Sequence, residues 1–123
     1  MKIDSARKIL LSVAATLALS IGPFSLPAFA ENLIPYVKNL TIKVGESAVI
    51  HGVRGACGQP PKNSQFVAYK LKTGTISYGA QGVRNSKKCG GKTPAVEVIF
   101  TATAPGKETF KVEGDTISVK VKE

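Results

Sequence analysis

The chain has 123 residues, with 17 Lys and Arg against 8 Asp and Glu, a formal net charge of +9 and a hydrophobic fraction of 43%. A chain of this length is limited to one domain. Because the hydrophobic fraction is ordinary, the positive charge is not that of a disordered basic tail, which lacks apolar residues. The sequence therefore indicates a folded, basic, single-domain protein.

The first thirty residues have the pattern of a secretory signal peptide. Three cations, Lys2, Arg7 and Lys8, precede an apolar run over residues 9–21. Residues 28–30 (Ala-Phe-Ala) then place small side chains at the alternate positions that signal peptidase recognises. The thirteen residues of the run, at about 1.5 Å each, cannot cross roughly 30 Å of hydrocarbon, which argues against a retained membrane anchor.

Cleavage after Ala30 would release residues 31–123 into the periplasm or the medium. Three cations and one acid leave with residues 1–30, so the mature part carries 14 Lys and Arg against 7 Asp and Glu, a net charge of +7. No transmembrane segment is expected in this mature form, and its oligomeric state is left open.

Both cysteines, Cys57 and Cys89, lie in the exported part. An oxidising compartment makes a disulfide the expected fate of a lone pair. Closure of a loop of about 33 residues should stabilise the fold by roughly 3 to 4 kcal/mol. The competing reading is a redox pair or metal site, but Cys-x-x-Cys spacing is absent and His51 alone could complete a ligand set. We therefore expect no metal and no cofactor.

The mature chain contains short segments with β-strand alternation, separated by turn residues, and no amphipathic helical stretch of useful length. Residues 113–115 (Glu-Gly-Asp) are expected to turn a hairpin between the last two segments. This pattern predicts an all-β protein, an immunoglobulin-like antiparallel β-sandwich of about seven strands with one disulfide. The expected strands are residues 40–44, 47–53, 65–71, 75–78, 96–102, 110–112 and 117–121.

Two stretches carry a resemblance to a known family. Residues 40–50 (Leu-Thr-Ile-Lys-Val-Gly-Glu-Ser-Ala-Val-Ile) and 98–112 (Val-Ile-Phe-Thr-Ala-Thr-Ala-Pro-Gly-Lys-Glu-Thr-Phe-Lys-Val) resemble the first and last strands of bacterial immunoglobulin-like domains. The same patterns are similar to chagasin-type inhibitors of cysteine proteases, which share that sandwich. The Asn-Pro-Thr-Thr-Gly-Tyr loop that those inhibitors insert into the protease is missing here. The resemblance thus implies a fold and carries over no functional residue.

A long segment of the mature chain contains no acidic residue. From Ser47 to Val96, a run of 50 residues, there is no Asp or Glu. Eight of the fourteen mature cations lie inside this run: Arg54, Lys62, Lys70, Lys72, Arg84, Lys87, Lys88 and Lys92.

The two stretches around the cysteines, residues 54–64 and 79–94, are rich in the Gly, Pro, Asn and Ser that are typical of loops. A Cys57–Cys89 bond would hold them together at one end of the sandwich. Glycine-rich backbone there could also present N–H groups to an anion. The candidate residues for binding an anion or a partner are Arg54, Lys62, Arg84, Lys87, Lys88 and Lys92.

These features predict an exported binding or adaptor module that recognises an anionic envelope component or an acidic protein. The competing reading is a solvated surface whose charge has no role. Nucleic acid is the least expected ligand, because these loops have no aromatic pair to stack on bases and the signal peptide directs the chain to another compartment. The alternative function is inhibition of an exported protease or other hydrolase.

The sequence does not predict an enzyme. A general base needs a nucleophile and an orienting group, and no acid lies within 45 residues of His51 on its C-terminal side. Three serines, Ser64, Ser77 and Ser86, stand in contexts that favour turn chemistry over nucleophilic catalysis.

Export should yield a protein that begins at Glu31 and contains a Cys57–Cys89 disulfide. Its intact mass without reductant should be that of residues 31–123 less two hydrogens. A product that retains residues 1–30, or two free thiols after native export, would contradict this prediction.

Overall fold

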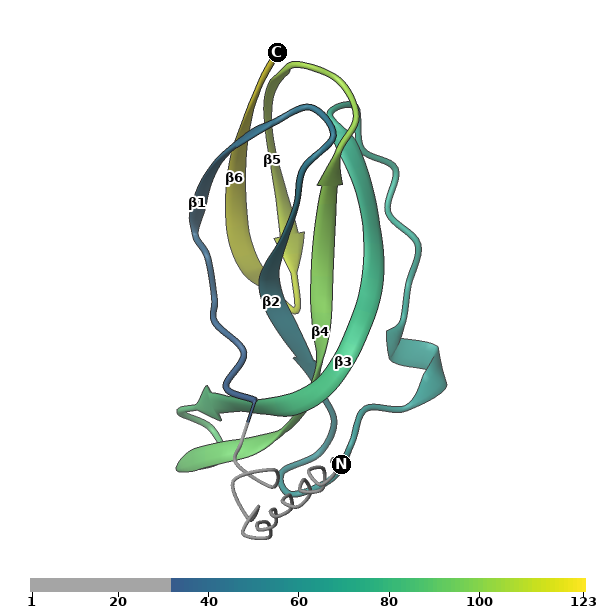
Figure 1. Ribbon diagram of the computed structural model, residues 1–123. Coiled ribbons are helices and arrows are strands. Elements are labelled where there is room, and N and C mark those ends of the chain that lie inside the picture. The colour runs from purple at the N-terminus through teal and green to yellow at the C-terminus, as the bar shows by residue number, and fades with distance from the viewer. Residues whose placement is uncertain (1–31) are drawn as a thin grey trace, which may run out of the picture. The chain divides into compact units, whose positions relative to one another are not determined.

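The computed structural model describes residues 32–123, so the expected signal peptide (1–30) and its cleavage site lie outside the described residues. Figure 1 shows an all-β arrangement with one short helix. Within this part of the chain no helix has the length and apolarity needed to cross a membrane. The elements are β1 (Asn39–Lys43), β2 (Ser47–Arg54), the 3₁₀ helix η3 (Asn63–Gln65), β3 (Gly74–Ser86), β4 (Gly91–Ala102), β5 (Gly106–Val112) and β6 (Asp115–Lys122).

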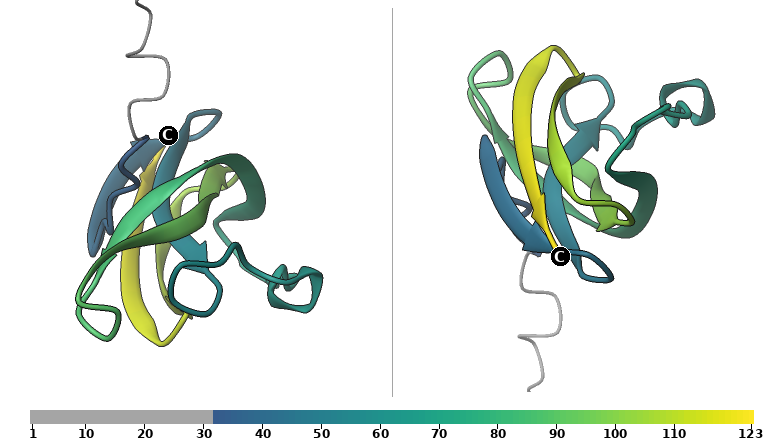
Figure 2. Two further views of the ribbon diagram at one scale, coloured as in Figure 1. Left: turned by 90° about the horizontal axis from the view of Figure 1, so that it is seen from below. Right: turned by 90° about the horizontal axis from the view of Figure 1, so that it is seen from above.

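The strands form two three-stranded sheets, in the orders β1-β6-β5 and β2-β4-β3. Figures 1 and 2 show the two sheets packed against each other. The expected all-β sandwich with one disulfide is therefore confirmed, with six strands in the described residues. Both sheets combine β-branched and aromatic residues with polar neighbours at alternate positions, the composition that suits a half-buried pleated surface.

The first and last strands lie side by side. β1 pairs in parallel with β6, from Asn39 opposite Ser118 to Lys43 opposite Lys122. All other strand pairings are antiparallel. Between β1 and β2 the chain crosses from one sheet to the other, and Gly45 takes a positive φ of 95° in that turn.

A two-residue turn joins β5 to β6. Glu113 and Gly114 both have positive φ angles, 52° and 84°. Two such residues in succession are typical of the type I′ turn, whose twist matches that of a two-stranded antiparallel ribbon. The hairpin expected from residues 113–115 is confirmed, and the turn places Glu113 and Asp115 at one end of the sandwich.

The core lies between the two sheets and is built from aliphatic side chains around one fully buried phenylalanine. Phe100 of β4 stacks on Phe110 of β5, with ring centroids 6.2 Å apart, and so links the sheets. The buried cluster comprises Ile42, Ile50, Val53, Val98, Phe100, Ala102, Val112, Ile117, Val119 and Val121.

Residues 65–71 were expected to form a strand, and this expectation is wrong. Only Gln65 has regular structure, as the end of η3, and the chain then runs to β3 without strand pairing. Side chains hold it instead: the Tyr78 hydroxyl donates to the Val67 carbonyl at 2.6 Å, and the Phe66 and Tyr78 rings meet edge to face. The alternation of apolar residues thus reflects packing along the sandwich edge.

The stretch 79–94 has loop composition, yet most of it is strand. β3 and β4 continue as a long hairpin whose turn is residues 87–90. The register shifts between Tyr78 and Gln81, and the Glu97 carboxylate accepts from the Ala80 N–H at 3.0 Å. A bulge of this kind bends a strand, and Figure 1 shows β3 curving as it approaches its turn into β4.

Glu108 of β5 also holds the irregular segment of residues 66–73 in place. Its carboxylate accepts hydrogen bonds from the backbone N–H groups of Lys72 and Thr73 and from the Thr73 hydroxyl, at 2.7–2.9 Å. Burial raises the pKa of Glu108, but these hydrogen bonds and the charge of Lys72 together lower it below the ordinary value of 4.5.

Glu108→Gln should destabilise the protein at pH 7, because a neutral amide accepts these bonds more weakly and presents its own NH₂ to donors. The loss of roughly 1 kcal/mol corresponds to a fall in Tm of about 4–8 °C. The folded pKa is lowered, so the stabilising contribution is present above pH 4.5 and is lost as the pH falls below it. Thermal unfolding of both proteins between pH 7 and pH 3 should show the difference shrinking with acidity; a difference that grows would refute this account.

Candidate functional site

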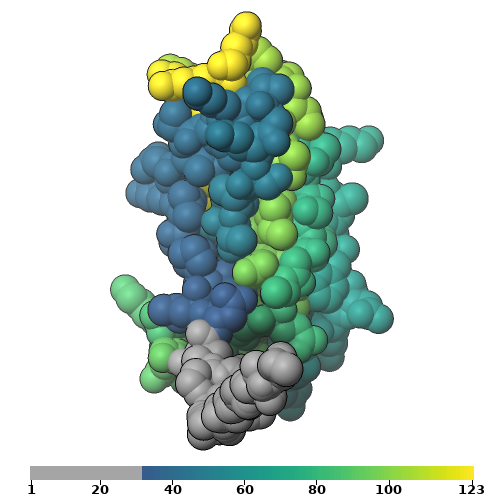
Figure 3. Space-filling view, viewed as in Figure 1, coloured from purple at the N-terminus to yellow at the C-terminus, as the bar shows by residue number. Residues whose placement is uncertain are grey.

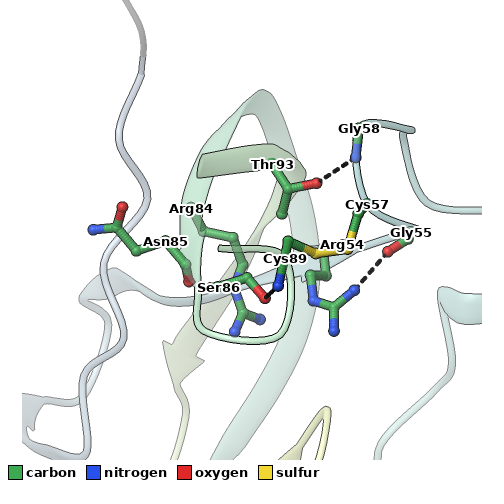
Figure 4. The surroundings of a disulfide bond; sticks show 9 residues. All are labelled: Arg54, Gly55, Cys57, Gly58, Arg84, Asn85, Ser86, Cys89 and Thr93. Carbon is green, nitrogen blue, oxygen red and sulfur yellow. Dashed lines mark hydrogen bonds between the residues drawn. A yellow bond between two sulfur atoms is a disulfide. The ribbon is translucent and has the colours of Figure 1, made fainter. Parts of the chain in front are cut away.

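The expected disulfide is confirmed and joins two segments at one end of the sandwich. Cys57 lies in the loop that follows β2, and Cys89 lies in the turn between β3 and β4, with their Cα atoms 5.4 Å apart. Two further bonds accompany it: Gly58 N–H donates to the Thr93 hydroxyl at 3.0 Å, and Cys89 N–H donates to the Ser86 hydroxyl at 3.3 Å (Figure 4). The disulfide and the Gly58–Thr93 bond therefore fix the loop to the β3–β4 hairpin, and the Cys89–Ser86 bond holds the hairpin turn itself.

The loop of residues 55–65 is also fixed to the end of β2. Gln65 accepts from the Lys62 N–H at 2.9 Å and donates to the Arg54 carbonyl at 2.8 Å. Gly55 is buried, and a Cβ there would lie 2.3 Å from the carbonyl oxygen of Pro60, so only glycine allows the chain to fold back this closely.

A cleft of about 1120 Å³ opens between these segments and the turn of the β5–β6 hairpin. It contains side chains from the end of β2, the 55–65 loop, the end of β3 and the 87–90 turn. Lys92 is not among its lining residues; it lies opposite Asn85 in the β3–β4 ladder. The other five residues expected from the sequence all line the cleft: Arg54, Lys62, Arg84, Lys87 and Lys88.

Backbone carbonyl groups orient the two arginines. Nη1 of Arg54 donates to the Gly55 carbonyl at 2.9 Å, and Nη1 of Arg84 donates to the Gly52 carbonyl at 2.9 Å. In Figure 4 both guanidinium groups point the same way and lie below the disulfide. Nε of Arg84 also donates to the Asn85 carbonyl at 3.4 Å. A guanidinium has five N–H donors, so each arginine is oriented by these bonds and retains donors for an anion.

The lysines of the hairpin turn are held less firmly. Lys87 and Lys88 are exposed, and among residues 32–123 no hydrogen bond or ion pair engages either ammonium group. They follow each other in the turn beside Cys89, so the disulfide keeps two adjacent positive charges at the rim of the cleft.

The sequence analysis missed two acids that line the same cleft. Glu113 Oε1 accepts from the Arg54 N–H at 3.1 Å and lies 4.0 Å from Nη1 of Arg84. Asp115 Oδ2 lies 2.8 Å from Nε2 of His51. Both belong to the β5–β6 turn, far along the chain from the acid-free segment, and the turn signal itself could have placed them at an end of the sandwich. The cleft therefore has five cations and two carboxylates.

His51 lies beneath the cleft and is 1% exposed. Its Nε2 lies 2.8 Å from Asp115 Oδ2, while its Nδ1 lies 2.7 Å from the backbone nitrogen and 3.0 Å from the carbonyl oxygen of Gly52. The ring of Tyr36 packs against it with centroids 5.1 Å apart. Because His51 belongs to β2 and Asp115 to β6, this pair joins the two sheets. The acid that orients the His51 ring is therefore Asp115, which lies 64 residues further along the chain.

Metal ligation finds no support in this region. Within the described part of the chain, no three or more His, Cys, Asp or Glu side chains come together in a way that could hold an ion. His51 and Asp115 contact each other, but no third ligand of this kind joins them among the described residues.

Comparison of the chain with protein-family models, with curated protein sequences and with solved structures gives no significant match. The similarity to chagasin-type inhibitors therefore has no support beyond the strand pattern and the sandwich. The function has to be argued from the cleft itself.

Replacing both cysteines, in Cys57→Ser with Cys89→Ser, should lower the free energy of unfolding by about 2–4 kcal/mol. The core is built from strands outside the cross-linked loops, so the far-ultraviolet circular dichroism spectrum should stay that of a β-sheet protein. Urea unfolding of the variant, and of the wild type with and without reductant, measures the effect. Equal midpoints for variant and wild type would show that the bond does not stabilise the fold.

Proposed function

We propose that the protein is an exported binding module whose basic cleft recognises an anionic partner, either an envelope component or an acidic protein. The observation that carries the proposal is the excess of positive charge in one cleft: five Lys and Arg side chains against two carboxylates. The disulfide supports an oxidising compartment such as the periplasm or the medium.

The arrangement of these charges favours binding over mere solvation. Charges on a solvated surface are normally interspersed, which keeps like charges apart. Here the disulfide and two hydrogen bonds of the loop, Gly58 to Thr93 and Gln65 to Arg54, hold the cations around one concave surface, at a cost in mutual repulsion that a bound anion would relieve. The two arginines are pre-oriented, which lowers the entropy lost when an oxyanion binds.

Inhibition of an exported protease or other hydrolase is the alternative. An inhibitor needs a segment that enters the active site of its target, and it should retain that enzyme in affinity capture from an envelope extract. A binding module should instead retain a nonenzymatic anionic component or acidic protein.

Anion binding to the folded state should raise the Tm in proportion to the logarithm of ligand concentration once it exceeds Kd. The measurement is a thermal-shift panel with heparin-like glycan, lipopolysaccharide, inositol phosphates and acidic peptides at low and physiological salt. Lys87→Glu with Lys88→Glu should abolish the shift, because it replaces two positive charges at the rim with two negative ones. Salt should weaken the effect, since the Debye length is about 8 Å at physiological ionic strength.

The matched control is Lys107→Glu with Lys120→Glu. These lysines are exposed, lie opposite each other in the β5–β6 ladder and do not line the cleft. The control changes the net charge equally and should keep most of the ligand-induced shift. If no anion stabilises the protein, or if both double variants behave alike, the basic cleft has no binding role.

A further inference from the structure

A second hollow of about 320 Å³ adjoins the basic cleft. Tyr36, Arg84 and Asn85 line both, so the two form one continuous surface. The second hollow has a different character: most of its remaining lining comes from the apolar segment Leu33, Ile34 and Pro35. The basic cleft and the apolar hollow therefore meet at Arg84 and Tyr36.

The segment beside this hollow presents exposed apolar side chains. Leu33 is 52% exposed and Tyr36 is 47% exposed, and they are two of the four large apolar side chains that are this exposed among residues 32–123. The other two, Val44 and Val67, line neither hollow. Exposed apolar groups gathered beside a charged cleft are typical of a surface that binds a partner.

Hydrogen bonds fix this segment in place. Ile34 N–H donates to the Val83 carbonyl at 2.8 Å, and Val83 N–H donates to the Asn32 carbonyl at 2.9 Å. The Tyr36 hydroxyl donates to the Thr116 carbonyl at 2.6 Å. Figure 3 shows the first described residues against the β3–β4 hairpin, where Leu33 bridges Val83 of β3. The exposed side chains thus stand on a backbone that is already ordered, and binding requires little further ordering.

We propose that the partner is an acidic polypeptide segment in which an aromatic or aliphatic residue neighbours the acidic ones. This inference rests on the proposed anion-binding function. The carboxylates bind the guanidinium groups of Arg54 and Arg84, a pairing that is bidentate when geometry allows. The neighbouring apolar side chain enters the hollow over Leu33 and Tyr36.

Charge complementarity and size favour a peptide over the other anionic partners. A sulfated or phosphorylated glycan has only the weakly apolar C–H faces of its sugar rings to place over Leu33. A lipid needs a continuous apolar surface for its acyl chains, whereas this hollow is small and bounded by the polar residues Asn85 and Arg84. In a peptide, by contrast, carboxylates and an apolar side chain alternate at the spacing of single residues.

The test compares two synthetic peptides by titration calorimetry: acetyl-Asp-Glu-Phe-Asp-Glu-amide and the same peptide with Ser in place of Phe. We expect the Phe peptide to bind roughly tenfold more tightly, the ratio that burial of about 60 Å² of apolar surface provides. Leu33→Ser should reduce this ratio to near one while leaving the affinity for the Ser peptide unchanged. The variant should fold, because the Leu33 side chain is exposed and the bridge to Val83 uses backbone atoms.

Val67→Ser is the matched control, since Val67 is similarly exposed, at 48%, and lies outside both hollows. It should keep the tenfold preference. Equal affinity for both peptides, or a preference that survives Leu33→Ser, overturns the inference while leaving the anion-binding function intact. Tighter binding of heparin-like glycan or of anionic lipid vesicles than of the Phe peptide also overturns it. If no anionic probe binds at all, the proposed function itself fails.

Discussion

The Cys57–Cys89 bond is the constraint on which the basic cleft depends. It ties a loop without regular structure to the turn of the longest hairpin, and both segments carry positive charge. Like charges repel, so without the bond the loop and the turn would be free to separate. The cross-link therefore stabilises the fold and also sets the distance between the two sides of the cleft.

Two acids that line the cleft, Glu113 and Asp115, come from the opposite sheet and hold the cations and the histidine from that side. Glu113 accepts from the backbone of Arg54 and faces Arg84, while Asp115 holds His51 at the junction of the two sheets. Each carboxylate is thereby engaged on the protein side, so the lysines at the rim remain for an external ligand. The tight turn between β5 and β6 makes this possible, because it brings both acids to the same end as the disulfide.

The sequence alone was sufficient for the sandwich, the disulfide and the cations of the cleft, because these depend on local patterns. Alternating apolar and polar residues indicate a strand, and two lone cysteines indicate a disulfide. A disulfide in turn brings together the cations that flank its two cysteines. The strand expected over residues 65–71 failed because packing of Phe66 and Tyr69 along an edge produces the same alternation as pairing does. The extended hairpin was missed because its glycines, typical of loops, here accommodate a bulge and a bend.

The contributions of Tyr36, Glu113 and Asp115 could not be foreseen for a different reason. Each is bonded to a residue far along the chain: Tyr36 to Thr116 at a separation of 80 residues, Asp115 to His51 at 64, and Glu113 to the Arg54 backbone at 59. Only the packing of the two sheets against each other brings these residues together. Local pattern carries no information about such contacts, so the mixed charge of the cleft and its apolar neighbour became visible only in the fold.

The parallel pairing of β1 with β6 has a mechanical consequence. Because the strands run in the same direction, the start of β1 and the end of β6 lie at opposite ends of the sandwich, as Figure 1 shows for the C-terminus. A pull between the two ends of the domain would load the whole β1–β6 ladder in shear, so that its hydrogen bonds share the force rather than open one after another.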